Sequence, residues 1–447
     1  MANINRSIRS MLENTDRWKL TLYGILAAFS TYFCMYAFRK PFSAATFKSD
    51  DGSILFFLNS GVELKTALVI SQILGYALSK YLGIKFCSEV SPARRAIYLV
   101  GTVLFALTAL VGYGLVPDDL KVLFIFLSGL PLGMVWGLVV WYLEGRTVSE
   151  VLLAGLSCSF ILASGIVKDI GRYVMSHWGV TEGWMPAVVG LLFLVPFFLS
   201  VWLLNQLPPP NKEDEIARTH REPMNSSQRM LFIKNYFWGL LMLVVAYFFL
   251  TAYRDYRDNY QVEMFSALDY SYEANKSIIT QAETVVAFGV LVPLALLFLI
   301  RNNRWGLIGT YAIMLSGVTI LGGSTWLLEQ GVMDGFWWMT CVGLGAYLAY
   351  VPYGSVLFDR LIAQGNVLGT AVFAIYIMDA LGYTGSVVVQ IYRDVFYSSG
   401  NEPNTDRLAF FIDFSYLMAA IGLVLFLASM LYFLARTRKQ NIKHAHS

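Results

Sequence analysis

The feature that most constrains this chain is a series of apolar stretches, each about as long as a membrane-spanning helix. Only 14% of the residues are charged, whereas soluble proteins carry roughly 25%. Because lipid cannot satisfy exposed backbone groups, apolar segments of this length cross a bilayer as helices. The sequence predicts an all-α integral membrane protein with twelve transmembrane helices, at residues 20–42, 64–84, 95–115, 121–143, 150–174, 184–206, 236–256, 278–300, 305–328, 335–358, 367–392 and 409–434.

Lysine and arginine are unequally distributed between the two sets of loops. If the N-terminus is cytoplasmic, twenty of these residues fall on the cytoplasmic side and six on the outer side. Cytoplasmic loops of membrane proteins carry the excess of Lys and Arg. We therefore expect both termini in the cytoplasm and the protein in the cytoplasmic (inner) membrane. The first stretch has no small-residue cleavage site, so we expect a retained helix rather than a signal peptide.

A polar segment at 207–235 has the composition of a cytoplasmic linker and divides the apolar stretches six and six. It separates an N-terminal half at 20–206 from a C-terminal half at 236–434, with cytoplasmic tails at 1–19 and 435–447. Two parallel six-helix halves joined in this way resemble the major facilitator superfamily. The resemblance implies a major-facilitator fold and alternating access to a site between the halves. Fold analogy alone names no substrate.

A sequence echo supports a duplication. The segment that ends at Arg39 has a counterpart 215 residues later that ends at Arg254, with a Tyr-Phe pair and an Ala-aromatic pair at matching positions. The same offset carries Glu144, at the end of one apolar stretch, onto Asp359 at the end of another. A shared offset at two distant places favours duplication over chance. Each half would then present one arginine to a common cavity.

Arg39 and Lys40 lie at the far end of the first apolar stretch, next to Pro41. One interpretation is that they only mark the outer end of that helix. However, positive charge is disfavoured on the outer side, and ionisable residues within spans are usually functional. Arginine offers a rigid fork of donors that suits phosphate or carboxylate, and two converging forks could hold a dianion. We therefore predict that Arg39 and Arg254 bind an anion.

Two motifs narrow the resemblance. The second stretch contains Gly75-Tyr76-Ala77-Leu78-Ser79-Lys80, and the first contains Tyr36-x-x-Arg39-Lys40-x-Phe42. Both are similar to motifs of the organophosphate:phosphate antiporters, the glycerol-3-phosphate and hexose-phosphate transporters. The resemblance implies that Arg39, Arg254 and Lys80 bind substrate and that phosphate is the counter-ion. Lys80 could instead snorkel to the cytoplasmic interface, and the histidine that these relatives tend to carry in helix 5 is absent here.

Acidic residues in the later stretches are candidates for salt bridges that rearrange during transport. Asp258 and Glu283 resemble acidic residues of helices 7 and 8 in that family, and we expect both to neutralise Lys40 when substrate is absent. Asp379 has no nearby cation in sequence, so it needs an interhelical partner or couples protons. Asp169 can pair with the arginine three residues later on one helix face, or it can carry a proton.

The segment Glu144-Gly145-Arg146 follows the fourth apolar stretch. It is similar to the superfamily's Glu-Arg-Gly element between helices 4 and 5, and Asp359 and Arg360 occupy the corresponding place in the second half. The resemblance implies charge pairs that hold the cytoplasmic gate closed. These four charged residues are therefore predicted gate residues, with a structural rather than a substrate-binding role.

Tyrosines recur near the predicted anion-binding residues. Three of them lie three residues apart in the tenth stretch, with Tyr350 in the middle. Such a stripe either packs in the core or lines a cavity, since tyrosine hydroxyls in lipid need partners. We take Tyr350 and Tyr36 as candidate substrate contacts.

No Walker motif, haem ligand set, zinc motif or nucleophile elbow occurs, and the four cysteines show no metal or disulfide spacing. The net charge of +3 gives no nucleic-acid signal. We expect a secondary transporter, not an enzyme, without a cofactor and, as in the superfamily, monomeric. It would take a small anionic, phosphorylated or similar metabolite with phosphate or a proton as counter-ion. A proton-coupled symporter of a sugar or other small solute and a transporter-like membrane sensor remain open.

Overall fold

The computed structural model describes residues 2–48, 53–59, 62–89, 91–144, 146–210, 214, 226–365, 371–394 and 403–445. Most of the predicted linker, together with Gly145 of the gate motif, lies outside these residues. The described part is helical, and its β-structure consists of two isolated bridges near the start of α3. The protein is all-α, as predicted.

Eight α-helices form the first half of the described chain: α1 (Ala2–Glu13), α2 (Arg17–Tyr36), α3 (Leu64–Glu89), α4 (Arg95–Leu115), α5 (Asp118–Leu132), α6 (Val135–Leu143), α7 (Ser149–Trp178) and α8 (Met185–Asn205). The second half has α10 (Ser226–Asn259), α11 (Gln261–Ala267), α12 (Ile278–Leu297), α13 (Asn303–Glu329), α14 (Gly335–Pro352), α15 (Phe358–Gly365), α16 (Ala371–Tyr392) and α17 (Pro403–Ala445). A π-helical turn, η4 (Tyr353–Leu357), connects α14 to α15.

Nine helical segments of the described residues are long and apolar enough to cross a membrane: Arg95–Leu115, Asp118–Leu143, Val151–Trp178, Met185–Asn205, Ile233–Asn259, Ile278–Leu297, Asn303–Glu329, Gly335–Ile362 and Arg407–Arg436. The other three predicted spans are occupied by α2, α3 and α16. The chain is therefore a multi-pass membrane protein.

The first predicted span, drawn to residue 42, is too long. Helix α2 ends at Tyr36, and a short 3₁₀ helix, η1 (Pro41–Ala44), follows. Proline has no N–H, and its ring clashes with the carbonyl four residues earlier, so Pro41 stops the helix. Arg39 and Lys40 consequently lie in a turn between two helices rather than on a continuous helix face.

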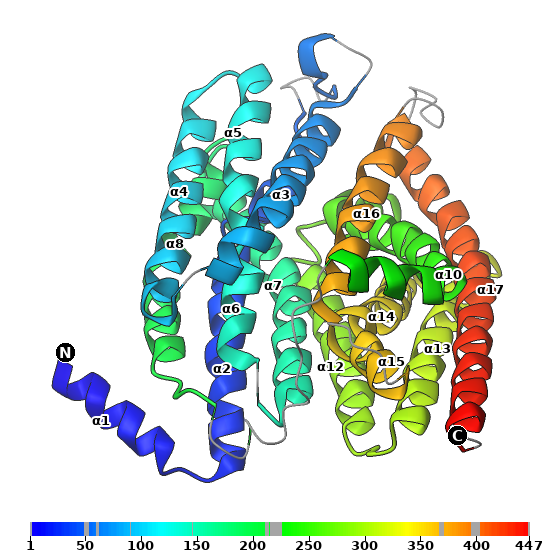
Figure 1. The fold of residues 1–447 in the computed structure, drawn as a ribbon. Helices are drawn as coiled ribbons and strands as arrows, with labels where there is room; N and C mark the ends of the chain where they lie inside the picture. The colour runs from blue at the N-terminus through cyan, green and yellow to red at the C-terminus, as the bar shows by residue number, and fades with distance from the viewer. Residues whose placement is uncertain are drawn as a thin grey trace.

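The helices form two groups, α1–α8 and α10–α17, which lie side by side in Figure 1. One hydrophobic core lies wholly in the second group, whereas the other fills the first group and reaches across to residues of α12, α14 and α16. The groups meet mainly where α7 packs against α12 and α3 against α16. Both chain ends lie toward the lower edge of the molecule in Figure 1.

Close packing inside the first group positions α3. A methyl group on Gly129 would lie 2.7 Å from the carbonyl oxygen of Gln72, and one on Gly133 would lie 2.6 Å from that of Tyr76. Only glycine lets helix backbones approach this closely. The glycines of α5 and of the break that follows it therefore hold the α3 segment that carries Tyr76.

Candidate functional site

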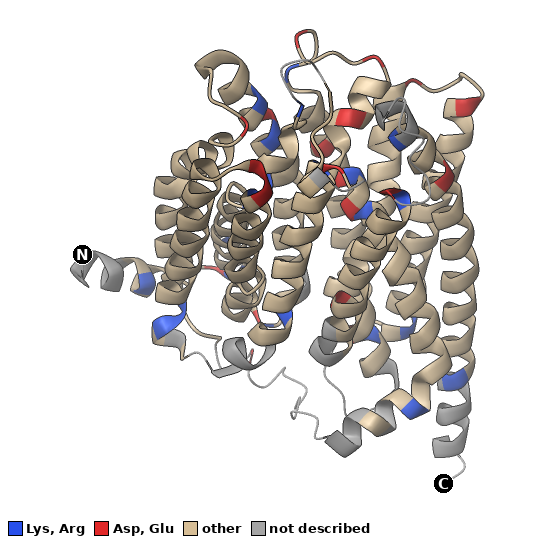
Figure 2. Cartoon of the chain, turned by 90° about the horizontal axis from the view of Figure 1, so that it is seen from above, with Lys and Arg blue, Asp and Glu red and all other residues tan. Residues whose placement is uncertain are grey.

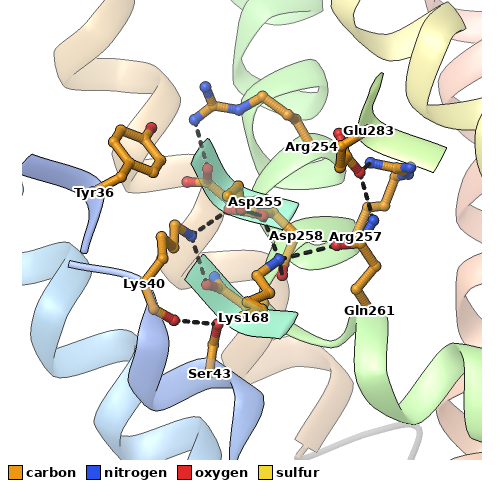
Figure 3. Close-up of polar contacts among 12 residues, drawn as sticks. Tyr36, Lys40, Ser43, Lys168, Arg254, Asp255, Arg257, Asp258, Gln261 and Glu283 are labelled. Carbon is orange, nitrogen blue, oxygen red and sulfur yellow. Dashed lines mark hydrogen bonds and ion pairs between the residues drawn. The ribbon is translucent and has the colours of Figure 1, made fainter. Parts of the chain in front are cut away.

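Eight buried charged side chains lie where the two groups of helices meet, and we call them the central cluster. Each is at most 8% exposed. Figure 3 shows most of them pointing toward one another from α7, α10 and the turn after α2. The cations are Arg39, Lys40, Lys168, Arg254 and Arg257, and the carboxylates are Asp255, Asp258 and Glu283. A buried charge is costly unless it is paired, so the distribution of partners within the cluster is informative.

Asp258, near the end of α10, lies at the centre of this cluster (Figure 3). Lys40 forms an ion pair with its Oδ2, and the Nζ of Lys168 lies 2.6 Å from its Oδ1. Ser164 donates a hydrogen bond to the same Oδ1. Lys40 also donates to Oδ1 of Asn259 at 2.8 Å. Since the donors belong to the first half and the acceptors to the second, Asp258 joins the two halves.

The expected pairing of Glu283 with Lys40 is wrong. Glu283 Oε1, on α12, instead lies 2.7 Å from Nη1 of Arg257 and accepts a hydrogen bond from Gln261 Nε2 at 2.5 Å. Arg257 also donates to the carbonyl oxygen of Met339. Arg257 lies one turn of α10 after Arg254, and its fork reaches α12 within the same half. Lys40, approaching from the other half, meets Asp258 first.

Arg39 has no carboxylate partner within 4.0 Å in the described part of the chain. Its side chain is 4% exposed. The guanidinium carbon lies 3.8 Å from the ring centre of Tyr76, and Nη1 donates to the hydroxyl of Tyr36 at 3.3 Å. Its Nε has no hydrogen-bond partner. A buried guanidinium is thus stabilised here by aromatic rings and a phenol instead of by an opposite charge.

Arg254, the counterpart of Arg39 in the second half, is paired with its neighbour Asp255 at 2.5 Å. Its guanidinium carbon lies 4.1 Å from the ring centre of Tyr350, and its Nε also has no hydrogen-bond partner. Arg39 likewise lies over the rings of Tyr76 and Tyr36, with its guanidinium carbon 5.6 Å from the ring centre of Tyr36. The two arginines of the sequence echo, one in each half, are therefore both packed against tyrosine rings.

Aromatic contacts cross between the halves close to these arginines. The ring of Tyr76 on α3 meets that of Tyr383 on α16, with centroids 5.3 Å apart. The ring of Phe160 on α7 meets that of Tyr347 on α14 at 6.0 Å. Within the second half, Tyr350 stacks on a further tyrosine, Tyr247. Of this tyrosine stripe, Tyr347 thus reaches the other half, whereas Tyr353 packs within its own half, where its hydroxyl donates to the carbonyl oxygen of Leu243.

Lys80 and Asp379 form a second ion pair between the halves, with Nζ 2.9 Å from Oδ2. Asp379 also accepts a hydrogen bond from the hydroxyl of Tyr247 at 2.8 Å. Asp379 therefore has an interhelical partner, one of its two predicted states. Lys80 points to this carboxylate from α3, and its ammonium Nζ lies 5.6 Å from the ring centre of Tyr76.

Asp169 is bound mainly to α12. Its Oδ2 accepts hydrogen bonds from the backbone N–H of Thr280 at 2.8 Å and from the Thr280 hydroxyl at 2.6 Å. Its predicted partner Arg172 lies 4.0 Å away and stacks over the ring of Tyr272. Asp169 thus connects the two halves near the first turn of α12, outside the central cluster.

The predicted gate residues lie at the ends of helices on the side of the termini. Glu144 caps α6, and Arg146 donates to the carbonyl oxygen of Pro208 at the end of the first half. Arg360 is buried and donates to Oδ1 of Asn303 at 3.1 Å, and Asp359 lies in the first turn of α15. These contacts lie within each half, and a charge pair across the gate stays a prediction.

Lys168, Asp255 and Arg257 belong to the central cluster but were not predicted as site residues. A local signal existed for all three, because each is a charged residue within a long apolar helix, where charges are usually functional. Lys168 precedes Asp169 directly, and Arg257 lies three residues after Arg254 on the same face of α10. Their partners could not be predicted, since these come from distant helices.

The chain resembles several known proteins. The model of the family described as "Family of unknown function (DUF5690)" matches residues 41–436. No curated protein matches the chain. A solved bacterial homologue of the human lysosomal transporter Spinster, inward-facing and unoccupied, is 13% identical with a TM-score of 0.59, over 94% of this chain and 99% of that one.

Two further solved structures are similar to the chain to about the same degree. The nucleoside transporter NupG is 13% identical with a TM-score of 0.58, over 93% of this chain and 99% of its own. The D-xylose-proton symporter is 14% identical with a TM-score of 0.55, over 91% and 97%. The TM-scores and the near-complete coverage confirm the predicted major-facilitator fold. Because the identities are this low, the likeness shows the fold alone. The narrower resemblance to organophosphate antiporters stays a prediction.

Proposed function

The chain belongs to a family of unknown function (DUF5690), and we propose that it is a secondary transporter of small organic anions, phosphorylated metabolites among them. The solved structures with the same fold are named as transporters, which supports transport rather than catalysis. We also propose that the halves at 20–206 and 236–434 rock about the central cluster, with both termini cytoplasmic, because the loops on that side carry the excess of Lys and Arg.

The observation that carries the proposal is the uncompensated charge of Arg39. The central cluster holds five cations and three carboxylates, all buried. Asp255 forms an ion pair with Arg254, Glu283 forms one with Arg257, and Asp258 pairs with both Lys40 and Lys168. Arg39 is left with tyrosines. An excess of buried positive charge favours an anion as the missing partner.

Energetics support an anion over a neutral solute. Moving an unpaired charge out of water costs several kcal/mol even after relaxation, and Arg39 is 4% exposed. A phosphate or carboxylate group accepts two parallel hydrogen bonds from one guanidinium. The Nε atoms of Arg39 and Arg254 are both without hydrogen-bond partners. An anion between the two arginines would supply those acceptors, with Tyr36 and Tyr350 beside it and Lys80 contributing to the positive field.

The position of Lys40 suggests how binding moves the halves. Lys40 follows Arg39 directly, so an anion on Arg39 lies close to the Lys40 ammonium. That anion competes with Asp258 for Lys40, and it thereby weakens one of the contacts by which the first half holds Asp258. A ligand drives a conformational change only through different affinities for the two states. Competition for Lys40 provides such a difference.

Counterflow in proteoliposomes tests the proposal. Vesicles loaded with inorganic phosphate receive labelled sugar phosphates outside, and uptake is compared for the wild type, Arg39→Lys and Arg254→Lys. Lysine keeps the charge but removes the two-pronged donor, so the variants test bidentate recognition and not only the electric field. We expect uptake that requires internal phosphate and falls at least about 100-fold in both variants, as for other precisely placed charge-assisted contacts.

Other outcomes would redirect the assignment. Uptake that follows an imposed proton gradient and persists in both variants would make the protein a proton-coupled symporter, with the arginines structural. Binding of a sugar phosphate without flux under either condition would indicate a membrane sensor. Neither binding nor flux of any anion would overturn the proposal.

A further inference from the structure

A second group of buried charges joins the halves at the end of the molecule away from the termini, and we call it the outer latch. It comprises Glu63 and Lys65 at the start of α3, Glu263 on α11, Arg393 at the end of α16 and Arg407 on α17. All five are at most 6% exposed. In Figure 2 most of the Asp and Glu residues lie on the side of the molecule opposite the C-terminus, together with some of the Lys and Arg residues.

Within the outer latch, the Glu63 carboxylate of the first half pairs with two arginines of the second half. Nη1 of Arg393 lies 2.9 Å from its Oε1, and Nη2 of Arg407 pairs with its Oε2. Each guanidinium therefore takes one carboxylate oxygen. The guanidinium carbon of Arg407 also lies 4.1 Å from the ring centre of Tyr260. Two arginine forks and an aromatic ring make the same kind of anion site as Arg39, Arg254 and their tyrosines.

If the halves parted at the outer latch, Arg393 would keep a carboxylate partner and Arg407 would lose its own. Arg393 keeps its neighbour Asp394, 2.8 Å away in the same half. Arg407 has no carboxylate within 4.0 Å other than Glu63 in the described part of the chain. Its Nη1 already has no hydrogen-bond partner. Opening would therefore leave a second positive charge without a partner.

Lys65 and Glu263 provide a contrast within the same latch. They form an ion pair between the halves. However, the Lys65 ammonium also donates to the carbonyl oxygens of Ser43 and Ala45 at 2.8 and 2.9 Å, both in its own half. Lys65 thus keeps acceptors when the halves part. Of the two sets of ion pairs in the latch, the one made by Glu63 therefore covers two arginines that could bind an anion, whereas Lys65 and Glu263 cover no such pair among the described residues.

We propose that Arg393 and Arg407 form a second anion-binding site, which the Glu63 carboxylate occupies while this face is closed and an incoming anion occupies when it opens. The proposal rests on the transport function proposed above. The ligand is a carboxylate or phosphoryl group with two oxygens for the two forks. Because anion and Glu63 exclude each other, binding here favours the open outer face, and opening raises the affinity for the anion by the same factor.

Phosphate binding measured by calorimetry tests the competition. The protein carries Arg39→Gln and Arg254→Gln, which silence the central site, and inorganic phosphate is the probe. Glu63→Gln removes the competing carboxylate, whereas the matched control Glu263→Gln removes a buried carboxylate from the same latch but leaves Glu63 on the arginines. A tethered competitor acts at an effective concentration of about millimolar or above, so Glu63→Gln should bind phosphate at least about tenfold more tightly than Glu263→Gln.

A distance measurement shows whether the latch opens. Spin labels at Leu120 and Val332, exposed residues of the two halves at this face, are introduced after the four native cysteines are replaced by serine. We expect phosphate to lengthen the label distance in the wild type. Glu63→Gln should lengthen it without phosphate. The double variant Glu63→Gln/Arg407→Gln, which restores charge balance, should lose the response to phosphate.

Equal phosphate affinities in Glu63→Gln and Glu263→Gln, or a phosphate response that survives Arg407→Gln, would overturn the inference. The proposed function fails separately: flux that ignores Arg39 and Arg254 would remove the transport model while tenfold tighter phosphate binding in Glu63→Gln would still establish the outer site. Conversely, flux that requires Arg39 with no effect of Glu63→Gln on phosphate binding would remove only the outer site.

Discussion

Replacing Asp258 by asparagine removes the one carboxylate on which two buried lysines converge. The side chain of Lys168 is 0% exposed and that of Lys40 is 4% exposed, so water does not screen the loss. Removing one partner of a buried ion pair costs about 3–5 kcal/mol. Asparagine still accepts the hydrogen bond from Ser164, so we take the lower limit. About 3 kcal/mol corresponds to about 150-fold in the equilibrium between joined and parted halves.

The assay is the label distance between Leu120 and Val332, measured without ligand. We expect a closed distribution in the wild type and a clear shift toward the open one in Asp258→Asn. Glu273→Gln is the matched control, because it also neutralises an acidic residue of the second half, but an exposed one. A distribution for Asp258→Asn that superimposes on the wild type would refute the reasoning that Asp258 joins the halves.

A double-mutant cycle separates the pairing from a general effect on folding. Lys168→Met removes one of the two ammonium groups that Asp258→Asn leaves unpaired, so the double variant should recover part of the closed population. Residues of one buried network show coupling energies of about 0.5–3 kcal/mol. Effects that simply add, with no recovery, would show that Lys168 and Asp258 act independently and would contradict the ion pair between them.

Two further predictions concern other parts of the interface. Gly343→Ala places a methyl group 2.4 Å from the guanidinium of Arg257, so Arg257 must shift and anion uptake should fall; Gly323→Ala, which meets nothing within 4 Å, is the control that should leave uptake unchanged. Burial raises the pKa of Glu63, but Arg407 and Arg393 outweigh it and hold that pKa below its ordinary value. The stability that its charge supplies is present above the ordinary pKa and is lost as the pH falls through the lowered one, so the label distance should stay constant from about pH 8 to pH 5; opening within that range would refute the assignment.

Local sequence properties determined the membrane fold. Apolar length decides whether a segment crosses the bilayer, and each predicted stretch coincides with helices of the described chain, although the first helix ends at Tyr36 rather than at residue 42. The sequence echo likewise brought out Arg39 and Arg254 as a pair, since duplication preserves position. The position of Pro41 could also have been used to predict where the first helix ends, because proline cannot continue a helix. In the structure α2 ends at Tyr36, before Arg39.

Only the tertiary structure decided which charges meet. Glu283 pairs with Arg257 rather than with Lys40, and Glu63 pairs with arginines more than 300 residues away. Buried ion pairs form wherever packing brings two side chains within reach, and sequence spacing predicts such contacts only within one helix, three or four residues apart. The chain's own pattern therefore determined that charges are buried at the interface. The packing of the two halves determined that, among the described residues, Arg39 is the cation of the central cluster without a carboxylate within 4.0 Å.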